Sequence, residues 1–124
     1  MCSSDLSEYF AQNCWIGSSF PKPRDAEVAR QIGADRFMWG SDYPHDEGTA
    51  PFTREHLRQV FHAYPEDEMR RILAGNAAKL YGFDLDALAP LAAQYGPTVG
   101  EIATPLTELP EHPNQSLLSG AGLR

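Results

Sequence analysis

The segment Gly40-Ser41-Asp42-Tyr43-Pro44-His45 holds the residues best suited to chemistry in this chain. Asp42 follows an apolar run and precedes a proline, so the backbone turns where the carboxylate emerges. A carboxylate at the carboxyl end of a strand in an α/β fold can coordinate a metal or take a proton from bound water. Asp42 can equally cap the turn through its side chain. Spacing alone leaves both interpretations open.

His45 lies three residues after Asp42 in the same predicted loop, close enough to contact the same substrate or metal. Although a loop histidine is more often a surface residue, we assign His45 a role in substrate binding. Asp46 and Glu47 add two carboxylates, which either divide acid and base roles with Asp42 or form a solvated acidic turn. The solvated turn is the preferred interpretation.

Trp15, Ser18 and Ser19 end an earlier predicted strand, and we expect them at the same rim as Asp42. Trp15 is assigned to substrate binding as pocket lining, with a place in the core as its alternative. The other histidines receive no role. His56 and His62 are six residues apart on a predicted helix and face different sides of it, and His112 lies near the C-terminus.

The spacing of apolar residues predicts a strand over residues 13–17, a helix over 26–32 capped by Asp25, and a strand over 37–40. The second strand is a continuous apolar run, Phe37-Met38-Trp39-Gly40, which is typical of a strand covered on both faces. Strand, helix and strand within about thirty residues form a βαβ unit with parallel pairing.

Helices are predicted downstream. A helix from Thr53 to Tyr64 carries Leu57, Val60, Phe61 and Tyr64 on one face. A helix after Pro65 carries Met69, Ile72, Leu73 and Ala77 inward and is kinked or split at Gly75-Asn76. A helix from Asp84 to Tyr95 carries Leu85, Leu88, Leu91 and Ala92 on one side and is bent or divided at Pro90. From Gly96 onward, prolines and few aromatic residues predict an extended, weakly packed tail.

The composition excludes several classes of protein. The chain has 124 residues and a net charge of -7 with scattered basic residues, which argues against a nucleic-acid partner. No apolar stretch is long enough for a membrane span, and no secretory signal is visible, so we expect no membrane partner and a cytoplasmic location. Cys2 and Cys14 lack zinc-site spacing and are expected to be reduced thiols.

The run from Phe37 to His45, followed by Ile72 to Phe83, resembles the C-terminal part of the amidohydrolase-related family, the relatives of aminocarboxymuconate-semialdehyde decarboxylase and resorcylate decarboxylases. The resemblance covers roughly residues 9–88. It implies a metal-dependent TIM barrel in which residues 13–17 are strand seven and 37–41 are strand eight. Asp42 then corresponds to the strand-eight aspartate, a metal ligand or catalytic base.

A complete barrel needs about 250 residues. We therefore expect an α/β chain that is a C-terminal fragment of a (β/α)8 barrel, with residues 1–6 as a non-native leader, 7–95 as barrel and 96–124 as tail. The leader assignment rests on the absence of periodicity and caps in residues 1–6, which resemble a translated adapter oligonucleotide.

The resemblance also implies that the other metal ligands are histidines, on strands of the barrel that this chain lacks. The full-length parent is expected to be a hydrolase or decarboxylase with zinc, or manganese, and a small-molecule substrate, with homo-oligomers allowed. The fragment alone is expected to be inactive, since a lone carboxylate makes no metal site. The competing interpretation is a small non-enzymatic helical domain that binds a partner through its C-terminal tail.

Overall fold

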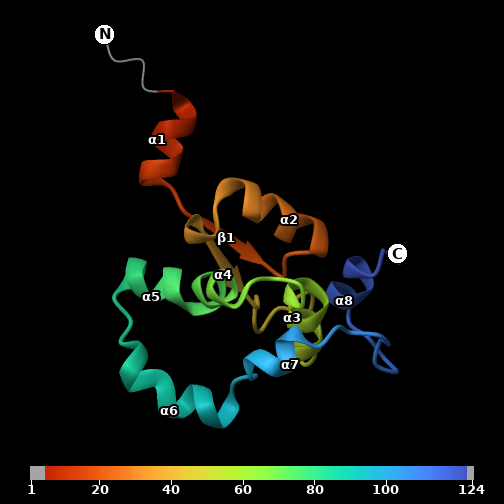
Figure 1. Ribbon diagram of the computed structural model, residues 1–124. Helices are drawn as coiled ribbons and strands as arrows, with labels where there is room; N and C mark the ends of the chain where they lie inside the picture. Colours follow the sequence, from red (N-terminus) through yellow and green to blue (C-terminus); the bar gives the residue numbers. More distant parts are fainter. Residues whose placement is uncertain (1–4, 123–124) are drawn as a thin grey trace.

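The computed structural model describes residues 5–122. Two short strands are surrounded by helices in a helix-rich α/β arrangement (Figure 1). The elements in chain order are α1 (Leu6–Asn13), β1 (Ile16–Ser19), α2 (Pro23–Ile32), η1 (Ala34–Arg36), β2 (Phe37–Gly40), α3 (Thr53–Phe61), α4 (Glu66–Arg70), η2 (Arg71–Gly75), α5 (Asn76–Tyr81), α6 (Leu85–Tyr95), α7 (Val99–Ala103) and α8 (Gln115–Gly120).

The two strands are parallel, and β1 pairs with β2 from Ile16 opposite Phe37 to Ser19 opposite Gly40. The predicted βαβ unit is therefore confirmed. Its first strand begins three residues later than expected, because Asn13 is the last residue of helix α1 and residues 14–15 connect that helix to the strand. Among residues 5–122 these are the only strands, so a closed barrel is not formed by the described chain.

The chain opens with α1 rather than with a strand. The carboxylate of Asp5 accepts a hydrogen bond from the Ser7 backbone amide at 3.3 Å and caps the helix. The expectation that residues 1–6 lack a cap is therefore wrong for Asp5 and Leu6, while residues 1–4 lie outside the described part of the chain.

Helix α2 begins earlier than predicted. Pro23 stands in its first turn, where the missing amide hydrogen costs nothing. Asp25 is the third helical residue rather than the cap, and its carboxylate accepts a hydrogen bond from the Lys22 backbone amide at 2.9 Å. Residues 23–25, which precede the predicted helix, thus form its first turn.

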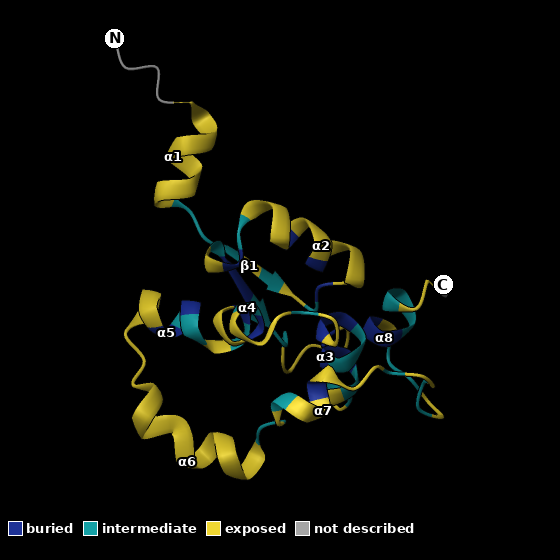
Figure 2. Cartoon of the chain, viewed as in Figure 1, coloured by how far each residue is buried: buried dark blue, intermediate teal, exposed yellow. Residues whose placement is uncertain are grey.

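The core lies between the strand pair and helices α2, α3 and α4 (Figure 2). Phe37 and Met38 are both buried although neighbouring side chains of a strand point to opposite faces, which confirms coverage of both faces at the start of β2. The buried apolar cluster comprises Ala26, Ala29, Ala34, Phe37, Leu57, Val60, Phe61, Met69, Ile72 and Ile102. The inward faces predicted for α3 and α4 are largely confirmed.

The helix after Pro65 is irregular where the sequence predicts it. A π-helical turn, η2, joins α4 to α5, and Asn76 follows directly after it. The buried Asn76 amide donates to the carbonyl of Ala34 at 2.6 Å and to that of Phe37 at 2.7 Å. The irregular turn therefore accompanies a polar side chain that ties the helix to the start of β2.

Helix α6 runs through Pro90 as one element and buries none of its residues (Figure 2). Of the two alternatives predicted at Pro90, a bend or a division, the division is wrong. Leu85, Leu88 and Leu91 are each roughly half exposed. The helix is therefore held at a distance from the strand pair rather than packed on it (Figure 1).

The segment after Gly96 is not extended and weakly packed as predicted. It contains α7, which begins with a capping box between Thr98 and Glu101, and α8, which is capped by Asn114. Ile102 on α7 is 4% exposed and Leu117 on α8 is fully buried. These apolar side chains pack within this chain, so they are not free anchors for a partner.

Candidate functional site

Polar residues gather at the carboxyl ends of both strands. Ser18 lies opposite Trp39 and Ser19 lies opposite Gly40 in the strand register, and Ser41 and Asp42 follow β2 directly. The parallel pairing therefore brings the ends of the two strands to one edge of the sheet. This confirms the predicted placement of Ser18 and Ser19 beside the motif.

Asp42 has a rare backbone conformation in the loop that follows β2. Its φ of 60° lies in the left-handed region, which non-glycine residues seldom adopt and which aspartate tolerates better than most. The Asp42 carbonyl accepts from the His45 backbone amide at 2.9 Å and closes a turn. Unusual backbone conformations of this kind cluster at active sites and ligand clamps.

The side chain that caps this turn is Ser41 rather than Asp42. The Tyr43 amide donates to the Ser41 hydroxyl oxygen at 3.2 Å. Within residues 5–122 no backbone amide donates to the Asp42 carboxylate. That carboxylate contacts the His45 ring instead, with 3.1 Å between His45 Nδ1 and Asp42 Oδ1. The turn-capping alternative for Asp42 is therefore not the one that the structure adopts.

Three side chains of the loop offer ligand atoms that converge. Atoms of Asp42, His45 and Glu47 all lie within 4.8 Å of one another. The Asp42 side chain is about three-quarters buried, whereas His45 and Glu47 are exposed. Imidazole and carboxylate ligands suit zinc and manganese, so the donor set fits a divalent metal. Sequence reasoning left Glu47 in a solvated turn, because spacing in an irregular loop does not reveal which side chains meet.

The loop beyond this group folds back on its own start. Thr49 is fully buried, and its backbone amide donates to the Ser41 carbonyl at 2.9 Å. A Cβ atom at Gly48 would lie 2.7 Å from that carbonyl and 3.0 Å from the carbonyl of Asp42. Glycine is therefore required where the returning chain passes the backbone of the candidate ligand.

Trp15 does not lie at this edge. It precedes β1, at the amino end of the strand pair, whereas Asp42 follows the carboxyl end of β2. Its ring packs under the guanidinium of Arg36, with 4.5 Å between the guanidinium carbon and the ring centroid. The prediction that Trp15 lies beside Asp42 is wrong. Trp15 precedes the first residue of β1, so it lies at the opposite end of the strand pair from Asp42.

The other histidines differ from one another in environment. His56 is 1% exposed, and its Nδ1 atom has no hydrogen-bond partner. Burial lowers the pKa of His56 from 6.5 to about 4, and hydrogen bonding to the backbone of Pro21 and Phe20 offsets this only in part. His62 and His112 are exposed. His56 is therefore a neutral core residue at physiological pH, and none of the three contributes to the group around Asp42.

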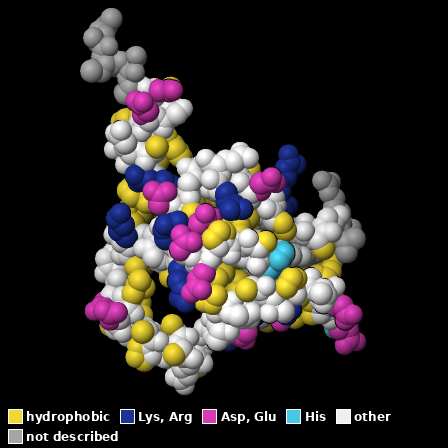
Figure 3. All heavy atoms as spheres, in the orientation of Figure 1, with side chains coloured by type: hydrophobic (Ala, Val, Ile, Leu, Met, Phe, Trp, Pro, Cys, Tyr) yellow, Lys and Arg dark blue, Asp and Glu magenta, His cyan; other side chains and the backbone are white. Residues whose placement is uncertain are grey.

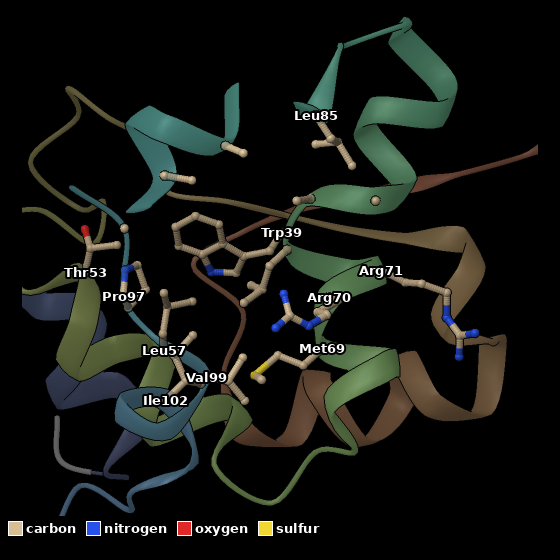
Figure 4. Close-up of a pocket in the computed structure, with 16 residues that line it drawn as sticks. Trp39, Thr53, Leu57, Met69, Arg70, Arg71, Leu85, Pro97, Val99 and Ile102 are labelled. Carbon is tan, nitrogen blue, oxygen red and sulfur yellow. The ribbon is translucent and has the colours of Figure 1, made fainter. Parts of the chain in front are cut away.

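An apolar cavity lies elsewhere in the fold. It has a volume of about 620 Å³ and lies between β2, α3, α4, η2, α6 and α7, and Figure 3 shows apolar side chains around the hollow beside α6. In Figure 4 Arg70 extends alongside Trp39 and Met69 toward this space, whereas Arg71 extends to the opposite side of its helix. Asp42, His45 and Glu47 are not among its lining residues. The cavity and the convergent ligand atoms are separate features.

Residues 10–83 match the model of a protein family described as Amidohydrolase, which is more than half of the chain. The match includes both strands and the loop that carries Asp42. No curated protein and no solved structure gave a significant match. Within residues 5–122, no helix has the length and apolar character needed to cross a membrane.

Proposed function

This chain belongs to the amidohydrolase family, and from that membership we propose that Asp42 is a metal ligand or catalytic base of a metal-dependent hydrolase. The observation that carries the proposal is the position of Asp42. It follows directly after β2 inside the family match, and its carboxylate faces His45 rather than serving as a cap for the backbone. A side chain placed in this way is available to a ligand.

The proposal includes a (β/α)8 barrel of which β1 and β2 are strands seven and eight. Parallel strands followed by helices are the repeating unit of that fold, and its active sites lie at the carboxyl ends of the strands. The remaining metal ligands would come from strands outside this chain. The proposal covers a hydrolase or decarboxylase acting on a small-molecule substrate, and in either one Asp42 would have the same role as metal ligand or base.

Zinc, or alternatively manganese, is the cofactor that suits the donor set. A bound divalent metal supplies a Lewis acid that makes its water more acidic. Asp42 would hold the ion or accept the proton of that water, and both roles need the ionised carboxylate. His45, from the same loop, would orient a polar group of the substrate at the edge of the strand pair.

The proposal is tested by adding Mn²⁺ to the isotope-labelled chain and following paramagnetic broadening of its amide signals. Broadening is expected around Asp42, His45 and Glu47 at weak, roughly millimolar affinity, because three ligands from one loop make an incomplete site. Asp42→Asn should raise the Mn²⁺ concentration needed severalfold. Asp35→Asn, an equivalent change in η1 at the other end of β2, should not.

An Asp42→Asn variant that binds Mn²⁺ like the wild type contradicts the role of Asp42 as a ligand. Zinc content and hydrolysis by the purified chain provide the second measurement. Weak zinc binding without turnover is expected for a chain that lacks the other ligands. Stoichiometric tight zinc with turnover would show instead that the chain carries a complete site.

A further inference from the structure

The segment that follows the family match returns to the loop that carries Asp42. Asn114 lies 31 residues beyond the last matched residue, Phe83. Its side-chain amide nitrogen lies 2.9 Å from the carbonyl oxygen of Gly48 and 3.2 Å from those of Thr49 and Ala50. One side chain thus binds three consecutive carbonyls of the loop.

Asn114 is itself held in place by helix α8. Its side-chain oxygen accepts from the Leu117 amide at 3.3 Å and from the Ser116 hydroxyl at 3.0 Å. Leu117 is fully buried, and its carbonyl accepts from the Gln59 side chain of α3 at 3.2 Å. The two ends of the Asn114 amide group therefore have separate tasks, since the oxygen caps α8 and the nitrogen binds the loop.

The bound carbonyls connect directly to the backbone of Asp42. Thr49 donates through its amide to the Ser41 carbonyl, and its hydroxyl lies 3.0 Å from that of Thr53 at the start of α3. Ser41 immediately precedes Asp42, whose φ is positive. A left-handed aspartate is unfavourable in isolation and persists when its surroundings hold it.

We propose that Asn114 is a positioning residue for Asp42, because its side-chain amide fixes the 48–50 turn and, through Thr49 and Ser41, the backbone from which the carboxylate projects. The metal role of Asp42 in this inference rests on the function proposed above. The segment from α7 to α8 is thereby part of the functional unit, although it lies outside the family match.

The test separates the two tasks of Asn114. Asn114→Asp keeps an oxygen to cap α8 and replaces the amide donor by an acceptor that faces three carbonyls. Asn13→Asp makes the same chemical change in α1, where the side chain binds only the Tyr9 carbonyl. Asn114→Ser provides a second variant, since serine also caps helices but is too short to hold the turn.

Hydrogen exchange of backbone amides reads out the position of the loop. In Asn114→Asp and Asn114→Ser, exchange at Gly48 and Thr49 should be about fivefold faster, as expected for the loss of a hydrogen bond worth about 1 kcal/mol. The Leu118 amide of α8 should stay protected, and Asn13→Asp should change neither. Unchanged exchange at Gly48 and Thr49 in either Asn114 variant, with α8 intact, would overturn the inference.

Mn²⁺ broadening reads out the carboxylate. Asn114→Asp should need about threefold more Mn²⁺ than the wild type to broaden the His45 and Glu47 amides, because a mobile backbone disperses the ligand atoms. If Asn114→Asp and the wild type need the same Mn²⁺ concentration for this broadening, Asn114 does not position Asp42. A third outcome is that Mn²⁺ does not broaden the loop signals of the wild type, while amide exchange is still faster in the Asn114 variants. This outcome would contradict the proposed metal role of Asp42 and, with it, the role of Asn114 in positioning a metal ligand.

Discussion

Helices α3 and α6 show opposite outcomes of similar apolar patterns. Helix α3 has nine residues and buries His56, Leu57, Val60 and Phe61. Helix α6 has eleven residues and buries none, although Leu85, Leu88 and Leu91 recur at helical spacing. An apolar stripe predicts that a helix has a face to bury, but a surface must be present to receive that face.

The largest effect should come from the core face of α3. Phe61 is 1% exposed and packs edge-on against Tyr64, with 5.2 Å between ring centroids. Phe61→Ala should lower the free energy of unfolding by about 3–5 kcal/mol, because it removes buried surface and leaves a cavity. Urea unfolding measures the change. A loss under about 1 kcal/mol would remove the contrast with α6.

Lowering the pH should reduce the free energy of unfolding by an intermediate amount, through the buried side chain of His56. The pKa of His56 is about 4 in the folded chain and near 6.5 when unfolded, so between these values the unfolded state binds more protons. The contribution of neutral His56 to the free energy of unfolding should be fully present above pH 6.5. The free energy of unfolding should fall by about 3 kcal/mol as the pH decreases toward 4. Urea unfolding across this window measures the loss.

Two variants assign that loss to its source. His56→Gln has no group that titrates there and should flatten the dependence between pH 6.5 and 4, whatever its own stability. His62→Gln, an exposed position one residue past α3, should keep the wild-type dependence. A dependence that survives in His56→Gln would mean that another group causes it.

The smallest effect should come from α6. Leu88 is 44% exposed, so Leu88→Ala should change the free energy of unfolding by less than about 0.5 kcal/mol. Amide exchange should also be faster in α6 than in α3, since a helix without buried residues opens locally. A cost above about 2 kcal/mol would mean that α6 packs against a surface of its own, and the comparison with α3 would fail.

Local patterns predicted much of the fold. The parallel βαβ unit, the inward face of α3 and the irregular helix near Gly75 are all present. These features depend on residues close together in the sequence, whose periodicity follows from the geometry of strands and helices. Strand β1 starts three residues later than predicted, because the helix that Asp5 caps extends to Asn13 and residues 14–15 connect it to the strand.

The sequence predicted Asp42 and His45 as neighbours in the candidate site, and their side chains lie 3.1 Å apart in the structure. Asp42 stands out because it directly follows an apolar strand, at the edge where α/β folds bind ligands, although its spacing also allows a turn cap. Trp15 was wrongly placed, since an error of a few residues in a strand boundary moves a side chain to the opposite end of the sheet. Glu47 was noted only as an acidic neighbour of Asp42 and assigned to a solvated turn, and nothing in the local sequence points to Asn114.

The sequence by itself determined the strand that presents Asp42 and, through the motif around it, the family of the chain. Only the tertiary structure decided which residues surround that carboxylate and what holds its loop. Asn114 reaches carbonyls more than sixty residues away along the chain. Such contacts depend on how helices pack, and a sequence pattern encodes the face that a helix buries but not the loop that it meets.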